Sequence, residues 1–325
     1  MSRVLTGDRP TGALHLGHYF GTLANRVRLQ RDGHELFVVV ADYQVIIDRD
    51  RPGALRETVR DLVRDYVAVG LDPDATVIFP HSAVPALNQL LLPFLSLVGM
   101  GELMRNPTVK DEISNAGRES VSGLTFTYPV HQAADILFCK GELVPVGRDQ
   151  LPHLELTRSI ARRFGERYDA IFPLPEPLLG EAPVLRGLDG RKMGKSLGNA
   201  IALSDDTDTV AAKIRGARTD SDRVITFEPD ARPEIANLLT IAALCSGRAP
   251  QDVAAEIGSG GAAQLKALTV EAVDDLLAPM RARRAAVGDH EIDHVLERGV
   301  KTATAIAEAT LAEVVRVMGM DVITL

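Results

Sequence analysis

The chain has 325 residues, of which 46% are hydrophobic and 25% are charged. This composition is ordinary for a globular protein and excludes a disordered or fibrous chain. At roughly 100–200 residues per domain, the length predicts two domains. The formal net charge is −8, from 44 acidic and 36 basic residues. Phosphate binding usually shows as an excess of Lys and Arg. The negative charge therefore excludes a protein that coats nucleic acids in general, and we expect no DNA partner.

Cysteine content and apolar stretches bear on where the protein works. Only Cys139 and Cys245 are present, too few for a disulfide framework or a four-cysteine zinc site, so we expect a reducing cytoplasm. The longest apolar stretch, residues 90–100, is far below the roughly 20 residues that a spanning helix needs. The first ten residues lack the apolar core of a signal peptide. We therefore expect neither export nor a membrane partner.

The first two-thirds of the chain alternates apolar segments typical of buried strands with amphipathic segments typical of helices. Strands are expected at residues 3–7, 35–42, 76–79 and 143–147, and helices at residues 14–31 and 52–70. This repetition predicts an α/β fold: a Rossmann-like parallel sheet with helices on both faces and ligand sites at the carboxyl ends of its strands. The polar stretch 106–123 is expected to be a loop or a partner-facing insertion.

Beyond about residue 203 the strand signal nearly disappears, and helices are expected at residues 209–218, 233–245, 270–287 and 292–318. We therefore expect an α/β domain over residues 1–204 and an all-helical domain over residues 205–325, whose last helix packs back on the first domain. The helical part has 13 basic and 20 acidic residues, a net charge of −7, whereas the first part has a net charge of −1. The helical domain is thus the acidic one.

A turn with two histidines follows the first expected strand and reads PTGALHLGH over residues 10–18. His15 and His18 share a helix face in the first turn, where backbone N–H groups and the helix dipole favour an anion. Gly17 between them removes a side chain where a flat ligand can approach the backbone. Imidazoles placed there can hydrogen-bond phosphate oxygens whose charge grows in a transition state. One capping and one exposed histidine would give the same pattern.

A second motif lies far downstream, where residues 190–199 read GRKMGKSLGN. Lys192 and Lys195 stand among glycines, which suits closure over a polyphosphate, and Ser196 adds a hydroxyl donor. A solvated linker between domains is often glycine-rich and basic as well. The spacing of a Walker loop is absent, which excludes a P-loop NTPase.

The two motifs together are more specific than either alone. HxGH after the first strand and KMxKS after the sheet resemble the paired signatures of class I aminoacyl-tRNA synthetases. Leu16 replaces the commoner Ile of the first signature, and Gly194 replaces the usual Ser of the second. The resemblance implies that the catalytic residues are His15, His18, Lys192 and Lys195.

Two further segments indicate a substrate pocket. Tyr128, Gln132 and Asp135 fall at i, i+4 and i+7 and form a polar stripe on an otherwise apolar helix. A surface helix would show the same pattern. Residues 144–150 (VPVGRDQ) end a strand and open a helix, where a parallel-sheet enzyme places ligand contacts. Asp149 and Gln150 equally suit a helix cap.

These segments resemble bacterial tryptophanyl-tRNA synthetases, from VLTG at residues 4–7 to PVGRDQLPHLELTR at residues 145–158, and the likeness covers essentially the whole chain. It implies that Asp135 accepts the indole N–H and that Tyr128 and Gln150 hold the α-amino group. A buried acceptor rejects analogues without the N–H more strongly than pocket size can, whereas tyrosine must be excluded by shape. The implied tryptophan site comprises Leu5, Gly7, Tyr128, Gln132, Asp135, Val144, Val146 and Gln150.

The same likeness implies an ATP site, with Asp149 at the ribose. Its members are Arg9, Thr11, Gly17, His18, Asp149, Val184, Leu185, Lys192, Lys195 and Ser196. Gln132 stands where common members have a Met beside the indole, and Leu5 where they have an aromatic residue. The pocket therefore resembles that of the divergent second-copy form found in some bacteria.

The implied reaction has two steps. The tryptophan carboxylate attacks the α-phosphate of ATP, and the tryptophanyl group then passes to a terminal ribose hydroxyl of tRNA(Trp). His15 and His18 would serve the α- and β-phosphates, and Lys192 and Lys195 the departing pyrophosphate. Mg²⁺ is expected to arrive with the nucleotide, because no carboxylate cage is apparent and no metal site is predicted. The likeness also implies a homodimer with tRNA crossing between subunits.

Three other functions stay open. A tyrosyl-tRNA synthetase shares the fold and both signatures. A small-molecule nucleotidyltransferase also uses an HxGH turn, but it explains neither KMxKS nor the helical part. A synthetase-like protein that only binds an amino acid is not indicated, because both histidines and both lysines are present.

For tRNA, the best basic candidate in the helical part is the triplet Arg281, Arg283 and Arg284, which equally suits an ordinary solvated turn.

Overall fold

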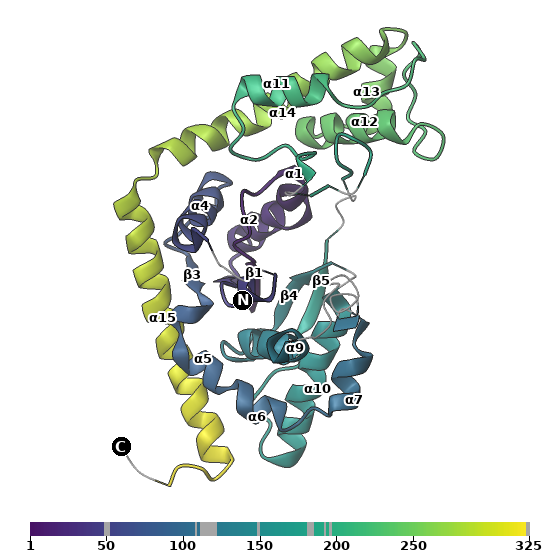
Figure 1. Cartoon of the computed structure of the whole chain (residues 1–325). Coiled ribbons are helices and arrows are strands. Elements are labelled where there is room, and N and C mark those ends of the chain that lie inside the picture. The colour runs from purple at the N-terminus through teal and green to yellow at the C-terminus, as the bar shows by residue number, and fades with distance from the viewer. Residues whose placement is uncertain are drawn as a thin grey trace.

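The computed structural model describes residues 1–48, 53–107, 109–110, 122–147, 150–180, 185–191, 193–194 and 197–322. In this described part, five parallel strands form one sheet in the order β3-β2-β1-β4-β5 (Figure 1). The strands are β1 (Arg3–Asp8), β2 (Glu35–Val40), β3 (Thr76–Pro80), β4 (Leu143–Val146) and β5 (Glu176–Leu179). The register of the central pair runs from Arg3↔Glu35 to Asp8↔Val40, so the carboxyl ends of β1 and β2 lie side by side.

Side-chain alternation along β2 explains why helices cover both faces of the sheet. Leu36, Val38 and Val40 belong to one hydrophobic cluster, and Phe37 and Val39 to the other. A strand buried on both faces reads as a continuous apolar run. The clusters hold the sheet against two pairs of helices: α2 (Ala24–Arg31) with α4 (Leu55–Ala68), and α9 (Gly123–Leu137) with α10 (Leu151–Arg167). The predicted Rossmann-like parallel sheet is confirmed.

Strand β5 is present although the sequence did not indicate it. Its four residues, EPLL, are mostly exposed, and Pro177 is the second of them. A short exposed strand shows neither a buried apolar run nor a clean alternation. Proline lacks a backbone N–H and is tolerated on an edge strand, where that group is not needed for pairing.

Short helices fill the connections between strands. They are α1 (Leu16–His18), α3 (Val45–Asp48), α5 (Pro85–Gln89), α6 (Leu91–Leu95) and α7 (Met100–Arg105), with a π-helical turn η1 (Tyr19–Leu23) and a 3-10 turn η2 (His81–Ala83). The single helix predicted over residues 14–31 is therefore α1, η1 and α2 in succession, because the π turn interrupts it. Such turns are frequent at functional sites. Most of the polar stretch predicted over residues 106–123 lies outside the described residues.

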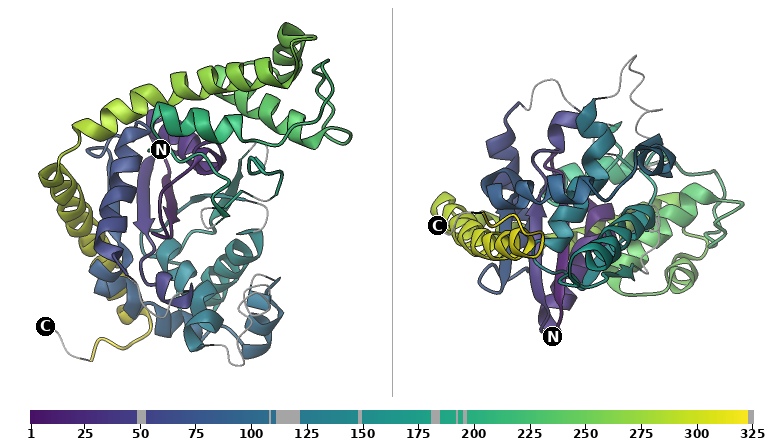
Figure 2. Two further views of the ribbon diagram at one scale, coloured as in Figure 1. Left: turned by 45° about the horizontal axis from the view of Figure 1, so that its top comes forward. Right: turned by 90° about the horizontal axis from the view of Figure 1, so that it is seen from below.

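The part of the chain after residue 204 is helical. Its elements are α11 (Thr207–Arg215), α12 (Pro233–Ser246), α13 (Pro250–Ile257), α14 (Gly261–Ala286) and α15 (Asp289–Val317). Helices α11–α14 pack together beyond one end of the sheet, and α15 runs back along its flank (Figures 1 and 2). One hydrophobic cluster runs without a break from α2 and α4 into α12 and α14. Within the described residues, no helix has the length and apolar character needed to cross a membrane.

Helix α15 lies against β3, an edge strand of the sheet, and glycine makes this approach possible. A Cβ atom on Gly299 would lie 1.8 Å from the carbonyl oxygen of Ile78. Glycine inside a helix costs up to about 1 kcal/mol relative to alanine, but here no other residue fits. Ala303, Ala307 and Val314 continue the buried side of α15 into the second cluster. The helical part is thus joined to the sheet along α15 as well as through α14.

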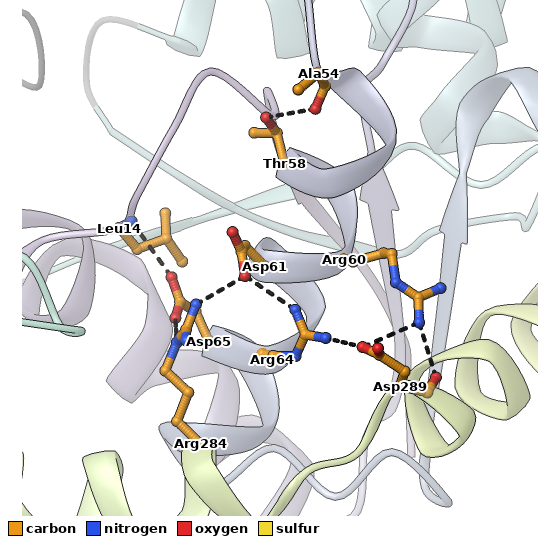
Figure 3. Close-up of polar contacts among 9 residues, drawn as sticks. All are labelled: Leu14, Ala54, Thr58, Arg60, Asp61, Arg64, Asp65, Arg284 and Asp289. Carbon is orange, nitrogen blue, oxygen red and sulfur yellow. Dashed lines mark hydrogen bonds and ion pairs between the residues drawn. The ribbon is translucent and has the colours of Figure 1, made fainter.

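Asp65 on α4 joins three parts of the chain (Figure 3). Its side chain is only 2% exposed. Oδ2 accepts the backbone N–H of Leu14 at 3.4 Å, and Oδ1 accepts Nε–H of Arg284 at 2.8 Å. Leu14 directly precedes His15 in the histidine turn, and Arg284 lies in the last turn of α14. Asp65 therefore links the histidine turn, the helix α4 that covers the sheet and the helical part of the chain.

The basic triplet near the end of α14 is engaged within the chain. Arg281 pairs with Asp274 of the same helix at 2.5 Å and donates to the hydroxyl of Thr207 on α11 at 3.2 Å. The guanidinium of Arg283 donates to the carbonyl of Ala68 at 2.7 Å. Arg284 pairs with Asp65 and also with Asp61, 3.0 Å away. These three arginines hold α14 to neighbouring segments, a role that their spacing in the sequence did not reveal.

Replacing Arg284 by Ala should destabilise the protein by about 2–4 kcal/mol, because it leaves Asp65 buried without its cation. The matched control is Arg64→Ala. Arg64 also spans this interface, but its partners Asp61 and Asp289 are more than half exposed (Figure 3), so the cost should stay below about 1 kcal/mol. Chemical denaturation measures both. Equal losses in the two variants would show that burial of Asp65 is not what makes the Arg284 contact matter.

Candidate functional site

Two cavities open at the carboxyl end of β1 and share Asp8 and Arg9. The first has a volume of about 290 Å³ and lies between β1, α9 and β4. The second has a volume of about 840 Å³ and lies between the histidine turn and residues 193–202. Ligand sites at this edge are the rule for open parallel sheets. The shared residues mean that ligands in the two cavities would meet at the end of β1.

The first cavity contains all eight residues predicted for the tryptophan site. They come from three separate segments: β1, α9, and the junction of β4 with α10. The residues are Leu5, Gly7, Tyr128, Gln132, Asp135, Val144, Val146 and Gln150. The polar stripe predicted on α9 thus faces a cavity rather than solvent. Gln150 caps α10, but its side chain makes no capping hydrogen bond, so the cap alone does not explain this residue.

Several polar residues of this cavity were not predicted from the sequence, among them Asp8 and Gln44. Asp8 is the last residue of β1, and Gln44 follows β2 by four residues. Gln44 is 5% exposed, and its Oε1 has no hydrogen-bond partner among the described residues. The available signal was position, since both residues follow the carboxyl end of a central strand.

Tyr128 and Asp135 occupy different surroundings on α9. The Tyr128 hydroxyl lies 3.0 Å from Nε2 of His153, and the guanidinium of Arg9 lies 5.8 Å from the centre of its ring. Asp135 is 3% exposed. Burial raises the pKa of Asp135 well above its ordinary value, and the nearby carboxylate of Asp42 adds to the rise. A buried carboxyl group without a cation is a strong acceptor for a ligand's N–H.

The histidine turn in the second cavity fixes its own rings. His15 caps α1, and its Nδ1 accepts the N–H of Gly17 at 3.1 Å. Nδ1 of His18 accepts the N–H of His15 at 3.2 Å, and the two ring centres are 3.8 Å apart. A neutral imidazole with an accepting Nδ1 carries its proton on Nε2. Both rings are therefore held as Nε2–H donors, which suits phosphate oxygens.

Gly17 is needed for close packing inside this turn. A Cβ atom on Gly17 would lie 3.0 Å from the His15 ring and 3.1 Å from Sδ of Met193. The glycine therefore also serves packing within the chain, and Met193 brings the downstream motif against the histidine turn.

The described residues of the downstream motif are anchored by Asn199. Its Oδ1 accepts the N–H of Gly194 at 3.0 Å, and its Nδ2 donates to Asp189 at 2.8 Å. Lys213 on α11 also lines the second cavity and pairs with Asp205 at 2.6 Å. Lys213 has no signal in the sequence, because it lies on a helix outside both motifs.

The residues predicted for ATP divide into three groups. Arg9, Thr11 and His18 line the second cavity, with Gly17 in the turn beside them. Leu185 is 6% exposed, belongs to the hydrophobic core and is not among the residues lining this cavity. The others lie outside the described residues: Asp149, Val184, Lys192, Lys195 and Ser196.

Asp8, between the two cavities, belongs to a buried network. Its Oδ2 accepts hydrogen bonds from Arg26 at 2.6 Å and from the Tyr66 hydroxyl at 2.7 Å. Arg26 is 1% exposed and also donates to the carbonyl of Gly7. Burial by itself raises the pKa of Asp8, but the Arg26 charge and the two hydrogen bonds outweigh it and leave the pKa below the ordinary 3.8. This carboxylate is therefore ionised and supports the end of β1.

Asp8→Asn should destabilise the protein by about 3–5 kcal/mol at neutral pH, because it leaves Arg26 buried without its anion. A lowered folded-state pKa contributes stability above the unfolded value of about 4, and this contribution is lost as the pH falls through the folded value. The difference in the free energy of unfolding between the wild type and D8N should stay constant above about pH 5 and become smaller below about pH 4. Denaturation at several pH values measures it.

The double variant Asp8→Leu with Arg26→Met is the control, because an apolar pair of similar size removes the unpaired charge. It should recover most of the stability lost in D8N. A gap between wild type and D8N that widens on acidification would contradict the assignment.

Comparison with known proteins places the chain in a family. Residues 1–278 match the family described as tRNA synthetases class I (W and Y). The tryptophan–tRNA ligase of Treponema pallidum is 40% identical over 330 residues, covering 99% of this chain and 98% of that protein. That of Halalkalibacterium halodurans is 38% identical over 324 residues, covering 98% of this chain and 97% of that protein.

Solved structures agree with this placement. The tryptophanyl-tRNA synthetase of Campylobacter jejuni, complexed with ADP and tryptophan, has a TM-score of 0.86 and 29% identity, covering 98% of this chain and 99% of that one. The tyrosyl-tRNA synthetase of Archaeoglobus fulgidus, complexed with L-tyrosine, has a TM-score of 0.67 and 26% identity, covering 87% and 90%. The chain belongs to the class I tRNA synthetase family that comprises the tryptophan and tyrosine enzymes.

Proposed function

We propose that the chain is an ATP-dependent ligase that attaches L-tryptophan to tRNA(Trp). The first cavity carries this proposal, because three separate segments bring together the eight predicted contact residues, one of which supplies the buried carboxyl group of Asp135. The relatives named as tryptophan–tRNA ligases match along almost the whole chain. A ligand with both an aromatic body and an N–H group fits these surroundings.

In the tryptophan site, we assign one polar role to each end of the substrate. Asp135 accepts the indole N–H, and Tyr128 and Gln150 hold the α-amino group. The remaining members form the walls: Leu5, Gly7, Gln132, Val144 and Val146. An analogue without the N–H would leave Asp135 desolvated and without a partner, which costs more than a small change in shape.

The second cavity is assigned to ATP, which brings Mg²⁺ with its phosphates. Its volume of about 840 Å³ accommodates a nucleotide. Arg9, Thr11 and Gly17 would lie at the nucleotide with His18, and a contact of Leu185 would involve its backbone. The assignment also includes the ATP residues predicted from the sequence that lie outside the described part: Asp149, Val184, Lys192, Lys195 and Ser196.

In the first step, an oxygen of the tryptophan carboxylate bonds to the α-phosphorus of ATP as the bond to the departing pyrophosphate breaks. Asp8 and Arg9 line both cavities, so the two substrates meet there. The Nε2–H donors of His15 and His18 stabilise charge on the α- and β-phosphates, and Lys192 and Lys195 hold pyrophosphate. In the second step a terminal ribose hydroxyl of the tRNA attacks the carbonyl carbon, and AMP leaves.

Transfer to tRNA requires a second binding surface. We propose that residues 1–204 form the catalytic domain and that the helical part, residues 205–325, recognises tRNA(Trp). The two free cysteines, Cys139 and Cys245, are consistent with the cytoplasm as the working compartment. The basic groups of Arg281 and Arg284 are paired within the chain, so the anticodon contacts lie elsewhere on the helical part.

ATP–pyrophosphate exchange across the amino acids tests the activity. Exchange with tryptophan should exceed exchange with tyrosine by at least about 100-fold, and charging of tRNA(Trp) should follow. Binding has a direct readout as well. The chain contains no tryptophan, so the bound substrate would be the only indole in the sample, and its emission would report on the pocket.

Each result separates the candidate functions. Exchange with tyrosine but not with tryptophan would assign a tyrosyl-tRNA synthetase, to which the family model also extends. A change in tryptophan emission without exchange would indicate a protein that only binds the amino acid. No binding and no exchange would contradict the proposal as a whole.

We also propose that the protein is a homodimer. Leu92 on α6 and Met100 and Met104 on α7 are 74%, 67% and 60% exposed. Large apolar side chains on successive helices favour a protein contact. Sedimentation at micromolar concentration should give twice the mass of the 35.0 kDa chain. Leu92→Glu combined with Met104→Glu should shift the distribution to the monomer, and a monomeric wild type would contradict the proposal.

A further inference from the structure

A group of buried polar side chains lies behind the first cavity, where the mechanism assigns no residue. His81 on η2 is 0% exposed, and His131 on α9 is 4% exposed. Their ring centres are 4.0 Å apart. Neither ring nitrogen of His81 has an aligned hydrogen-bond partner among the described residues, although the side chain of Asn88 lies close enough to oppose the lowering of its pKa. Oδ1 of Asp135 has no hydrogen-bond partner there either. Buried polar atoms without partners are rare in folded proteins and call for an explanation.

His81 approaches Asp135 within hydrogen-bonding distance. Nδ1 of His81 and Oδ1 of Asp135 lie 3.1 Å apart, although the two groups are not aligned as a hydrogen bond. Asp135 lines the first cavity, and its Oδ1 is turned inward to His81, so Oδ2 is the oxygen left for a ligand. Polar contacts in a ligand-free site often tighten when the ligand binds.

Neighbouring side chains hold the His81 ring in place. His131 stacks against it, and Nε2 of His131 is itself bonded to Oδ1 of Asn88 at 2.7 Å. Tyr43 packs edge-on, with its ring centre 5.4 Å from that of His81. Burial lowers the pKa of His81 well below its ordinary value and that of His131 to about 4. Both rings are therefore neutral, and His81 has one ring N–H to place.

Because His81 is neutral, it holds a proton between its Nδ1 and Oδ1 of Asp135, whichever of the two groups carries it. If Asp135 is ionised, Nδ1–H of His81 donates to Oδ1. If Asp135 is protonated, Oδ1–H donates to a bare Nδ1. Oδ2 stays an acceptor in both cases. Without His81, a protonated Asp135 could carry its proton on Oδ2, where it would face the indole N–H as donor against donor.

We propose that His81 is a positioning residue for substrate selection: its Nδ1 engages the inner oxygen of Asp135, so that the outer oxygen always accepts an N–H from the ligand in the first cavity. This inference rests on the proposed function and adds to it the group that makes Asp135 selective. The ligand class is an aromatic amino acid with a ring N–H donor. His81 does not contact the substrate and acts only through Asp135.

Three variants of His81 test the inference. The amide nitrogen of Asn takes the place of Nδ1, whereas that of Gln takes the place of Nε2 and does not reach Asp135. His81→Leu removes both ring nitrogens. The readout is kcat/KM in ATP–pyrophosphate exchange for tryptophan and for the benzothiophene analogue of tryptophan, in which sulfur replaces the ring N–H. A merely structural role would affect both substrates alike.

The wild type should prefer tryptophan over the analogue. In H81L and H81Q, kcat/KM for tryptophan should fall about 10- to 100-fold, which is the value of a hydrogen bond to a charged group. In the same variants, kcat/KM for the analogue should stay within about threefold of the wild-type value. H81N should retain the preference. His131→Gln keeps a donor for Asn88 and does not reach Asp135, so it should also retain the preference.

Several outcomes would overturn the inference. Equal losses for both substrates in H81L and H81Q would reduce His81 to a structural residue, and so would an H81N variant without the preference. If H81L does not fold, the comparison of H81N with H81Q still decides. A wild type that uses tryptophan but does not distinguish the analogue would also overturn it. A wild type inactive with tryptophan would contradict the proposed function itself.

Discussion

Burial of the Asp65 carboxylate ties the catalytic turn to the helical part of the chain. Removing a charge from water costs several kcal/mol unless a well-placed partner restores the interaction. Asp65 obtains its partners from two distant segments, the N–H of Leu14 and the guanidinium of Arg284. The carboxylate is therefore well solvated by the protein only when the histidine turn and α14 are both in place. Because Leu14 directly precedes His15, the position of the helical part constrains the ring to which we assign the phosphate contact.

Three carboxyl groups are buried near the site, and they differ in whether a cation of the same chain is paired with them. This difference distinguishes the carboxyl groups that support the fold from the one left for a ligand. The pKa of Asp8 is lowered, since Arg26 outweighs the effect of burial, whereas burial outweighs Arg284 and raises that of Asp65. The pKa of Asp135 is raised furthest, because no cation offsets its burial. Asp8 and Asp65 have their cations within the chain and belong to the scaffold. Asp135 has none, so the partner that completes its surroundings is the ligand.

The sequence predicted those parts of the site that a single segment encodes. Residues 15–18 place two rings on one turn, and α9 places Tyr128, Gln132 and Asp135 on one stripe, because helical spacing fixes which side chains meet. The sheet followed from apolar runs such as β2. His81, Lys213 and the pairing of Arg284 depend on contacts between segments, and no local pattern records those contacts. Strand β5 is stabilised by its neighbour β4 rather than by burial of its own residues, so hydropathy did not reveal it.

Charge in the helical part bears on the tRNA binding that we propose for it. Its net charge is −7, and Lys213, Arg232, Arg248, Arg281, Arg284 and Arg298 are all in ion pairs with acidic residues of the same chain. A cation that is already paired adds little to a long-range field, so the helical part cannot attract tRNA from a distance as a basic surface does. If the helical part recognises tRNA(Trp) as proposed, its contribution comes from contacts formed after encounter, such as stacking and edge contacts with unpaired anticodon bases. Coupling through Asp65 then gives those contacts a direct route to the histidine turn, because α14 is held to the same carboxylate as Leu14.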